Sequence, residues 1–116
     1  MEAFRAIPIQ ERIEMASKIR LKYPTRVPLI CDGEDPPAQR AKKRIKYLVP
    51  RDMTLGTFQQ VIRRKGAVAT TQAIYFFCNN GKLLSSSVTL GHLSETMSGD
   101  DGFVYIRYRP ESTFGL

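Results

Sequence analysis

The segment that most constrains the fold is residues 73–78, AIYFFC, an almost unbroken run of apolar and aromatic side chains. A run of this kind is typical of a central β-strand. The turn signal NNGK at residues 79–82 follows it directly and ends the strand. The rest of the chain therefore has to supply neighbouring strands and a helix that covers the sheet.

Three further segments have strand character. Residues 45–49, IKYLV, are β-branched and aromatic and end at Pro50, and residues 103–108, FVYIRY, make the last strand. Residues 26–31, RVPLIC, are extended, but Pro28 predicts an edge strand or a bulge because proline cannot donate to a ladder. The following stretch, CDGEDPPAQRAKKR, is rich in Gly, Pro and charge and is predicted to be a loop.

Helical periodicity marks three segments. Residues 11–23 carry apolar side chains at helical spacing and end before Pro24. Residues 54–65 begin with Thr54 as a candidate N-cap. The apolar stripe of this second helix consists of Leu55, Phe58, Val61 and Ile62. A short third helix is predicted around residues 90–97.

The element order helix, strand, strand, helix, strand, strand predicts an α+β fold, a ubiquitin-like β-grasp. We expect a four-stranded mixed sheet with a crossover helix on one face and an N-terminal helical extension on the opposite face. The expected units are the extension at 1–24, the core at 25–109 and a flexible C-terminal tail at 110–116.

Strand alternation places four apolar residues on the face away from the crossover helix. They are Pro28, Ile30, Leu48 and Phe103. This face is too apolar to be left bare. We expect the N-terminal helix to cover it in part, through Ile19, and to leave gaps.

Charge is distributed unevenly along the 116 residues, whose net charge is +7. Residues 1–65 hold 15 basic and 7 acidic residues, whereas residues 66–116 hold 3 and 4. The first half therefore favours an acidic partner: nucleic acid, a membrane surface or an acidic peptide. No apolar run approaches the ~20 residues that span a bilayer. The N-terminus lacks the long apolar segment of a signal peptide, so we expect a cytoplasmic monomer.

The sequence does not indicate an enzyme or a metal site. The single histidine, His92, accompanies no nucleophile motif, and the glycines form no phosphate-binding loop. Cys31 and Cys78 lack metal-ligand spacing and are expected to be buried as small apolar residues in a reducing compartment. We expect no catalytic residue, no metal and no cofactor.

Several motifs together carry a resemblance to a known family. They are KIR at 18–20, KYP at 22–24, RVP at 26–28, KYLVP at 46–50 and the ending FGL at 114–116. In these the chain resembles the autophagy ubiquitin-like modifiers, of the GABARAP and microtubule-associated light-chain-3 type. The similarity runs from about residue 7 to the end of the chain and is shared between the two branches.

The resemblance implies processing and lipid attachment at the tail. A cysteine protease would recognise Phe114, Gly115 and Leu116 and cleave after Gly115. Activating and carrier enzymes would then join Gly115 to phosphatidylethanolamine, so that the cytoplasmic protein moves to autophagosome or vesicle membranes. Glycine suits this role because a residue without Cβ allows close backbone approach in a narrow channel.

The resemblance also implies docking of autophagy receptors with a short acidic motif, aromatic-x-x-aliphatic, along the strand at 45–49. The first pocket, for the aromatic residue, would be lined by Ile19, Pro28, Ile30, Lys46, Leu48 and Phe103. The second, for the aliphatic residue, would be lined by Tyr47, Val49, Pro50, Met53, Phe58, Val61 and Ile62. The contacts to acidic residues would come from Arg26, Arg44, Lys46 and Arg63. About half of the second set is expected to be core first and pocket lining second.

Two features of the sequence depart from the family pattern. A rim position of the first pocket that is often acidic is Met15 here, and Glu14 points about 100° away around the helix. This change favours apolar contact over recognition of an indole donor. A Pro-Pro pair of some relatives is replaced by Leu83 and Leu84.

Two other functions stay open at this point. A scaffold that is not conjugated, binding peptides or microtubules through its basic N-terminal helix, would use the same charges. A nucleic-acid-binding module fits the charge and the tyrosines, but the basic residues are scattered and no recognition motif is present, so no nucleic acid is expected.

Overall fold

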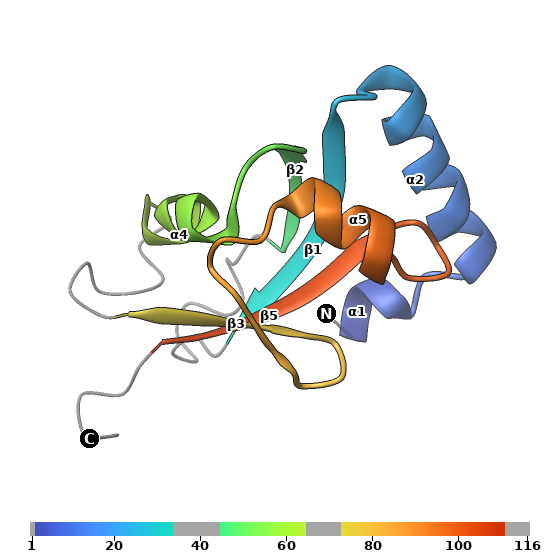
Figure 1. Ribbon diagram of the computed structural model, residues 1–116. Coiled ribbons are helices and arrows are strands. Elements are labelled where there is room, and N and C mark those ends of the chain that lie inside the picture. The colour runs from blue at the N-terminus through green and yellow to red at the C-terminus, as the bar shows by residue number, and fades with distance from the viewer. Residues whose placement is uncertain (1, 34–44, 65–72, 111–116) are drawn as a thin grey trace.

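A computed structural model describes residues 2–33, 45–64 and 73–110. The strands are β1 (Arg26–Gly33), β2 (Lys46–Pro50), β3 (Ile74–Cys78), β4 (Leu83–Leu84) and β5 (Val104–Pro110). They form a five-stranded sheet in the order β2-β1-β5-β3-β4 (Figure 1). β1 and β5 pair in parallel and the other neighbours pair antiparallel, so the sheet is mixed.

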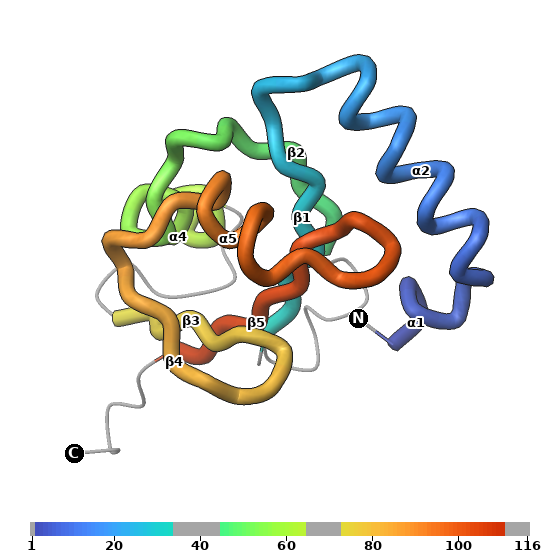
Figure 2. Tube along the Cα trace, turned by 45° about the vertical axis from the view of Figure 1, so that its right-hand side comes forward, coloured from blue at the N-terminus to red at the C-terminus, as the bar shows by residue number. Residues whose placement is uncertain are grey.

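The helices cover both faces of this sheet. They are α1 (Glu2–Arg5), α2 (Ile9–Lys22), α4 (Leu55–Arg64) and α5 (Leu90–Met97). α1 and α2 lie on one side of β1 and β5, and α4 and α5 lie on the other, as the tube in Figure 2 shows. Within the described ranges no helix is long and apolar enough to cross a membrane.

The main core lies between the sheet and the helices α4 and α5. Phe58 of α4 is fully buried and packs edge-on against Tyr47, with ring centroids 5.2 Å apart. α4 begins as the sequence predicts, because Thr54 Oγ1 accepts a hydrogen bond from the Thr57 amide at 3.1 Å. The β-grasp with an N-terminal helical extension is thereby confirmed.

A second, smaller core lies under α1 and α2. Its buried members are Phe4, Ala16, Ile30, Phe103 and Tyr105, and Ile7, Met15, Ile19 and Ile45 pack against them. The cover is more complete than expected from the sequence. Ile30 is 0% exposed and Phe103 is 2% exposed, because α1 adds Phe4 to the contribution of α2.

The interpretation of Pro28 as a sign of an edge strand or bulge is wrong. β1 is an interior strand, between β2 and β5. The Cys31 amide donates to Ile45 O at 2.8 Å, so the backbone of every second residue of β1 faces β2. The backbone nitrogen of position 28 is an odd number of residues away and therefore faces β5. Pairing with β5 starts only at Leu29, so proline removes no ladder hydrogen bond.

Three further details differ from the prediction. The sheet has five strands instead of four, because Leu83 and Leu84 pair with β3 as the short strand β4. Residues 31–33 belong to β1, so the loop predicted from Cys31 onward starts later. β3 is interior as predicted, yet its burial alternates and Tyr75 is 43% exposed, so one face of this apolar run is open.

Candidate functional site

The strand predicted to dock receptors, β2, forms one edge of the sheet. Since Ile45 O accepts from β1, alternation turns the backbone groups of Tyr47 and Val49 toward β1 and those of Lys46 and Leu48 toward the outer side. Leu48 O accepts a hydrogen bond there from Arg26 Nη1 at 3.4 Å. An added strand would pair with the backbone of Lys46 and Leu48.

The residues assigned to the first pocket come together as a first cluster on the face of β1 and β2 toward α1 and α2. Register places Pro28 opposite Leu48 and Ile30 opposite Lys46. Phe103 and Ile19 join Ile30 in the smaller core. Leu48 and Ile19 are half-buried and Lys46 is exposed, whereas Pro28, Ile30 and Phe103 are buried. Met15 is half-buried and packs against the smaller core, next to residues of the first pocket.

The residues assigned to the second pocket form a second cluster on the α4 side of β2. They divide into a buried group and a half-buried group. Val49, Phe58 and Ile62 are buried members of the main core. The half-buried members, which offer surface to a partner, are Tyr47, Pro50, Met53 and Val61. The division agrees with the expectation that about half of this set is core.

Cationic side chains lie near the two clusters. Lys46 and Arg26 are exposed, on neighbouring strands, and Arg63 is half-buried on α4. Arg44 and the tail residues Phe114, Gly115 and Leu116 lie outside the described residues. The two cysteines are buried, as predicted, and His92 is exposed on α5. No group of His, Cys, Asp and Glu side chains fit to hold a metal ion occurs in the described ranges.

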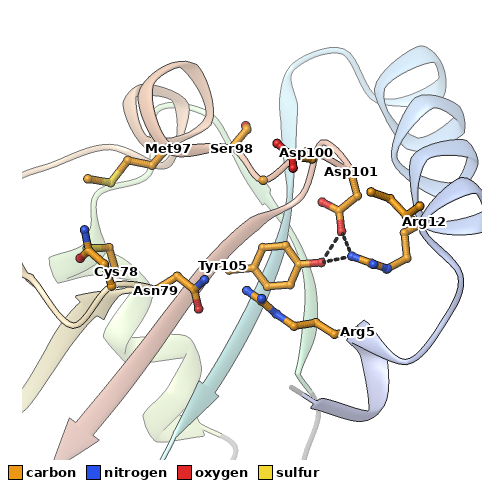
Figure 3. Close-up of a pocket in the computed structure, with 12 residues that line it drawn as sticks. Arg5, Arg12, Cys78, Asn79, Met97, Ser98, Asp100, Asp101 and Tyr105 are labelled. Atoms are coloured by element: carbon orange, nitrogen blue, oxygen red, sulfur yellow. Dashed lines mark hydrogen bonds and ion pairs between the residues drawn. The ribbon is translucent and has the colours of Figure 1, made fainter.

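A polar network that sequence reasoning missed holds α2 against β5. Asp101 Oδ2 accepts hydrogen bonds from the Tyr105 hydroxyl and, at 2.8 Å, from Arg12 Nη1 (Figure 3). Asp101 Oδ1 accepts from the Phe103 amide at 2.9 Å. The Asp101 side chain is 1% exposed. Burial, and then the hydrogen bond to Asp101, raise the pKa of Tyr105 above 10.0. Tyr105 is therefore neutral at physiological pH and donates its proton to the carboxylate.

This network forms one wall of a cavity of about 550 Å³, lined also by Arg5, Met97 and the turn residues Asn79 and Asn80. No local pattern predicts the network, because Arg12 and Asp101 are 89 residues apart in the chain. None of the residues assigned to the two receptor pockets lines this cavity.

Comparison with known proteins agrees with this geometry. A family model described as autophagy protein Atg8, ubiquitin-like, matches residues 11–115. Autophagy-related protein 8 of Mycosarcoma maydis is 37% identical over 106 residues, which cover 91% of this chain and 89% of that protein. The crystal structure of Trypanosoma brucei ATG8 superposes with a TM-score of 0.82 at 28% identity, over 99% of this chain and 98% of that one. The chain therefore belongs to the Atg8 family of ubiquitin-like autophagy proteins.

Proposed function

We propose that this chain is a conjugated autophagy modifier with two separable activities. After cleavage behind Gly115 it is joined through that glycine to phosphatidylethanolamine, and at β2 it recruits receptors that carry an acidic aromatic-x-x-aliphatic motif. Within the family, the support for conjugation is that the match extends to residue 115 and so includes the glycine. Support for recruitment is the edge strand β2 with an apolar cluster on each side.

The chemistry at the tail needs no catalytic group, metal or cofactor of this chain. The processing cysteine protease hydrolyses the bond between Gly115 and Leu116 and frees the glycine carboxylate. Activating and carrier enzymes adenylate that carboxylate, pass it through thioesters and deliver it to the lipid amine. Each buried methylene of the lipid contributes ~0.8 kcal/mol, and two acyl chains hold a protein on a membrane where one does not.

Intact mass tests conjugation directly. From starved cells of its source, the soluble pool is expected to contain the chain without Leu116, and the membrane pool the chain with a phospholipid adduct on Gly115. An unchanged full-length mass in both pools would contradict conjugation. It would leave the unconjugated scaffold, with peptides or microtubules as partners, as the better description.

Replacing Leu48 with glutamate is expected to weaken binding of an acidic aromatic-x-x-leucine peptide roughly 100-fold, about 2.7 kcal/mol. The side chain is half-buried beside the first cluster, so the substitution removes apolar contact and sets a carboxylate against an acidic ligand. Isothermal titration calorimetry measures the change.

The matched control is Leu83→Glu, which makes the same change on β4 at the opposite edge of the sheet, where Leu83 is 57% exposed. Peptide affinity should stay within about twofold of wild type for this variant. Equal losses for both variants would place the peptide elsewhere or indicate a charge effect of the whole molecule. Binding to β2 should also persist in high salt, because its anchors are apolar, whereas nucleic-acid binding would fall steeply.

A further inference from the structure

The N-terminal helix α1 places an aromatic ring on the first cluster. Phe4 is 5% exposed, and its ring packs edge-on against Phe103 with centroids 5.0 Å apart. It belongs to the same buried cluster as Ile30, with Ile19 packed against that cluster. Three residues assigned to the first pocket thus share a cluster with a phenylalanine of this chain.

The same ring also lies near the charged member of the set. Lys46 Nζ is 6.0 Å from the Phe4 ring centroid, within reach of a cation–π contact. Ile30 and Phe103 have almost no exposed surface while Phe4 is in place. A receptor's aromatic side chain that is to contact Phe103 and Ile30 beside Lys46 therefore finds this surface covered.

We infer that Phe4 is an intramolecular occupant of the first pocket, which the aromatic residue of a receptor has to displace. This inference rests on the proposed receptor binding at β2. It makes α1 an autoinhibitory element: a receptor binds the state in which α1 has left the face. The apparent dissociation constant then equals the intrinsic one divided by the fraction of molecules in that state.

α1 is built to leave at low free-energy cost. It spans only Glu2–Arg5, too short for a helix to persist without packing. Phe4 is its single buried side chain. Its remaining aromatic contacts are both with Tyr105: the Phe4 and Tyr105 ring centroids lie 6.4 Å apart, and the Arg5 guanidinium carbon lies 4.4 Å from the Tyr105 ring centroid. Figure 3 shows Arg5 beside the Tyr105 ring. Short segments held by so few buried side chains open locally without global unfolding.

Truncating the occupant tests the inference. Phe4→Ala is expected to bind a short acidic peptide, with Phe and three positions later Leu, about tenfold more tightly than wild type. Ile9→Ala is the matched control, because it truncates another apolar residue of the N-terminal segment that is 44% exposed and outside the cluster. Its affinity should equal that of wild type. Unchanged or weaker binding by Phe4→Ala overturns the inference, the latter because Phe4 would then support the pocket wall.

A second variant follows the displacement itself. The chain contains no tryptophan, so Phe4→Trp adds a single indole whose emission reports the burial of position 4. Emission should be blue-shifted in the free protein and should shift to the red as the tryptophan-free peptide binds. The fluorescence titration should have the same midpoint as the calorimetric titration. Binding without a red shift overturns the inference.

The outcomes separate this inference from the proposed function. If wild type and Phe4→Ala bind the peptide equally, receptor docking stands and the occupancy of the pocket by Phe4 falls. If neither of them binds, receptor docking at β2 falls and the inference falls with it. Binding by Phe4→Ala alone supports both.

Discussion

Replacing Asp101 with alanine is expected to lower the free energy of unfolding by about 3 kcal/mol. The carboxylate is 1% exposed and accepts hydrogen bonds from Arg12, from the Tyr105 hydroxyl and from the Phe103 amide. Alanine leaves the hydroxyl and the amide without their acceptor and the guanidinium without its counter-charge. Urea unfolding should show a lower midpoint with an unchanged slope.

Asp100→Ala is the matched control, since it removes the same charge from the neighbouring, exposed position. Its stability should stay within about 0.5 kcal/mol of wild type. Asp101→Asn, which keeps the shape and one acceptor oxygen, should fall between the two. A loss below about 1 kcal/mol for Asp101→Ala would mean that water satisfies these donors and that the network is not a structural anchor.

The consequence of losing Asp101 would reach the N-terminal face. Arg12 Nε also donates to Ile7 O at 2.9 Å, at the turn between α1 and α2. The guanidinium thus ties β5, α2 and that turn together. The charge pair of Arg12 and Asp101, beside Tyr105, therefore helps to hold the face that carries the first cluster in shape.

The main elements could be predicted from the sequence because each carries a complete local signal. Residues 11–23 have helical spacing and a terminating proline, and α2 spans Ile9–Lys22. The helix after Thr54 has both a cap and an apolar stripe, and α4 spans Leu55–Arg64. The run AIYFFC gave an interior strand. Such signals depend on neighbours within a few positions, so one sequence suffices.

The elements that were missed are too short to have a period. α1 has four residues and β4 has two, and each is fixed by tertiary contacts: Phe4 on Phe103, and Leu84 opposite Phe76. One signal for β4 was the pair Leu83 and Leu84 after the turn, because leucine, unlike proline, can donate to a ladder. The prediction from Pro28 was wrong for a related reason. A proline removes a ladder hydrogen bond only where the neighbouring strand is paired, and the pairing of β1 with β5 starts at Leu29.

The faces on which the candidate site residues lie could be predicted from the sequence, but the exposure of their side chains could not. Alternation correctly separated Ile30 and Phe103 from the main core, and family resemblance supplied the roles. Whether those side chains are open to a partner depends on α1, which lies more than 20 residues away in sequence from either. The contact between Asp101 and Arg12 was also not predicted, because the two residues are far apart in the sequence. A local sequence pattern does not show which side chains are buried by distant segments.

Replacing Gly115 with alanine is expected to abolish the phospholipid adduct. A methyl group at this position would obstruct the close approach of backbone that the proposed processing and carrier enzymes need, and every later proposed step would use the carboxylate that cleavage frees. The membrane pool should then contain no lipidated chain by intact mass. Persistence of the adduct on the variant would show that another residue carries the lipid.

The same variant also tells whether attachment and docking are separate activities. Gly115→Ala should bind the acidic peptide with wild-type affinity, since β2 and the tail lie far apart in sequence. Leu48→Glu should show the reverse, a full phospholipid adduct and weak peptide binding. If both variants lose both activities, a common folding defect is the cause, and urea unfolding would show it. If each loses one, the chain carries a membrane anchor and a receptor surface that act independently, as expected of a modifier that links cargo to a membrane.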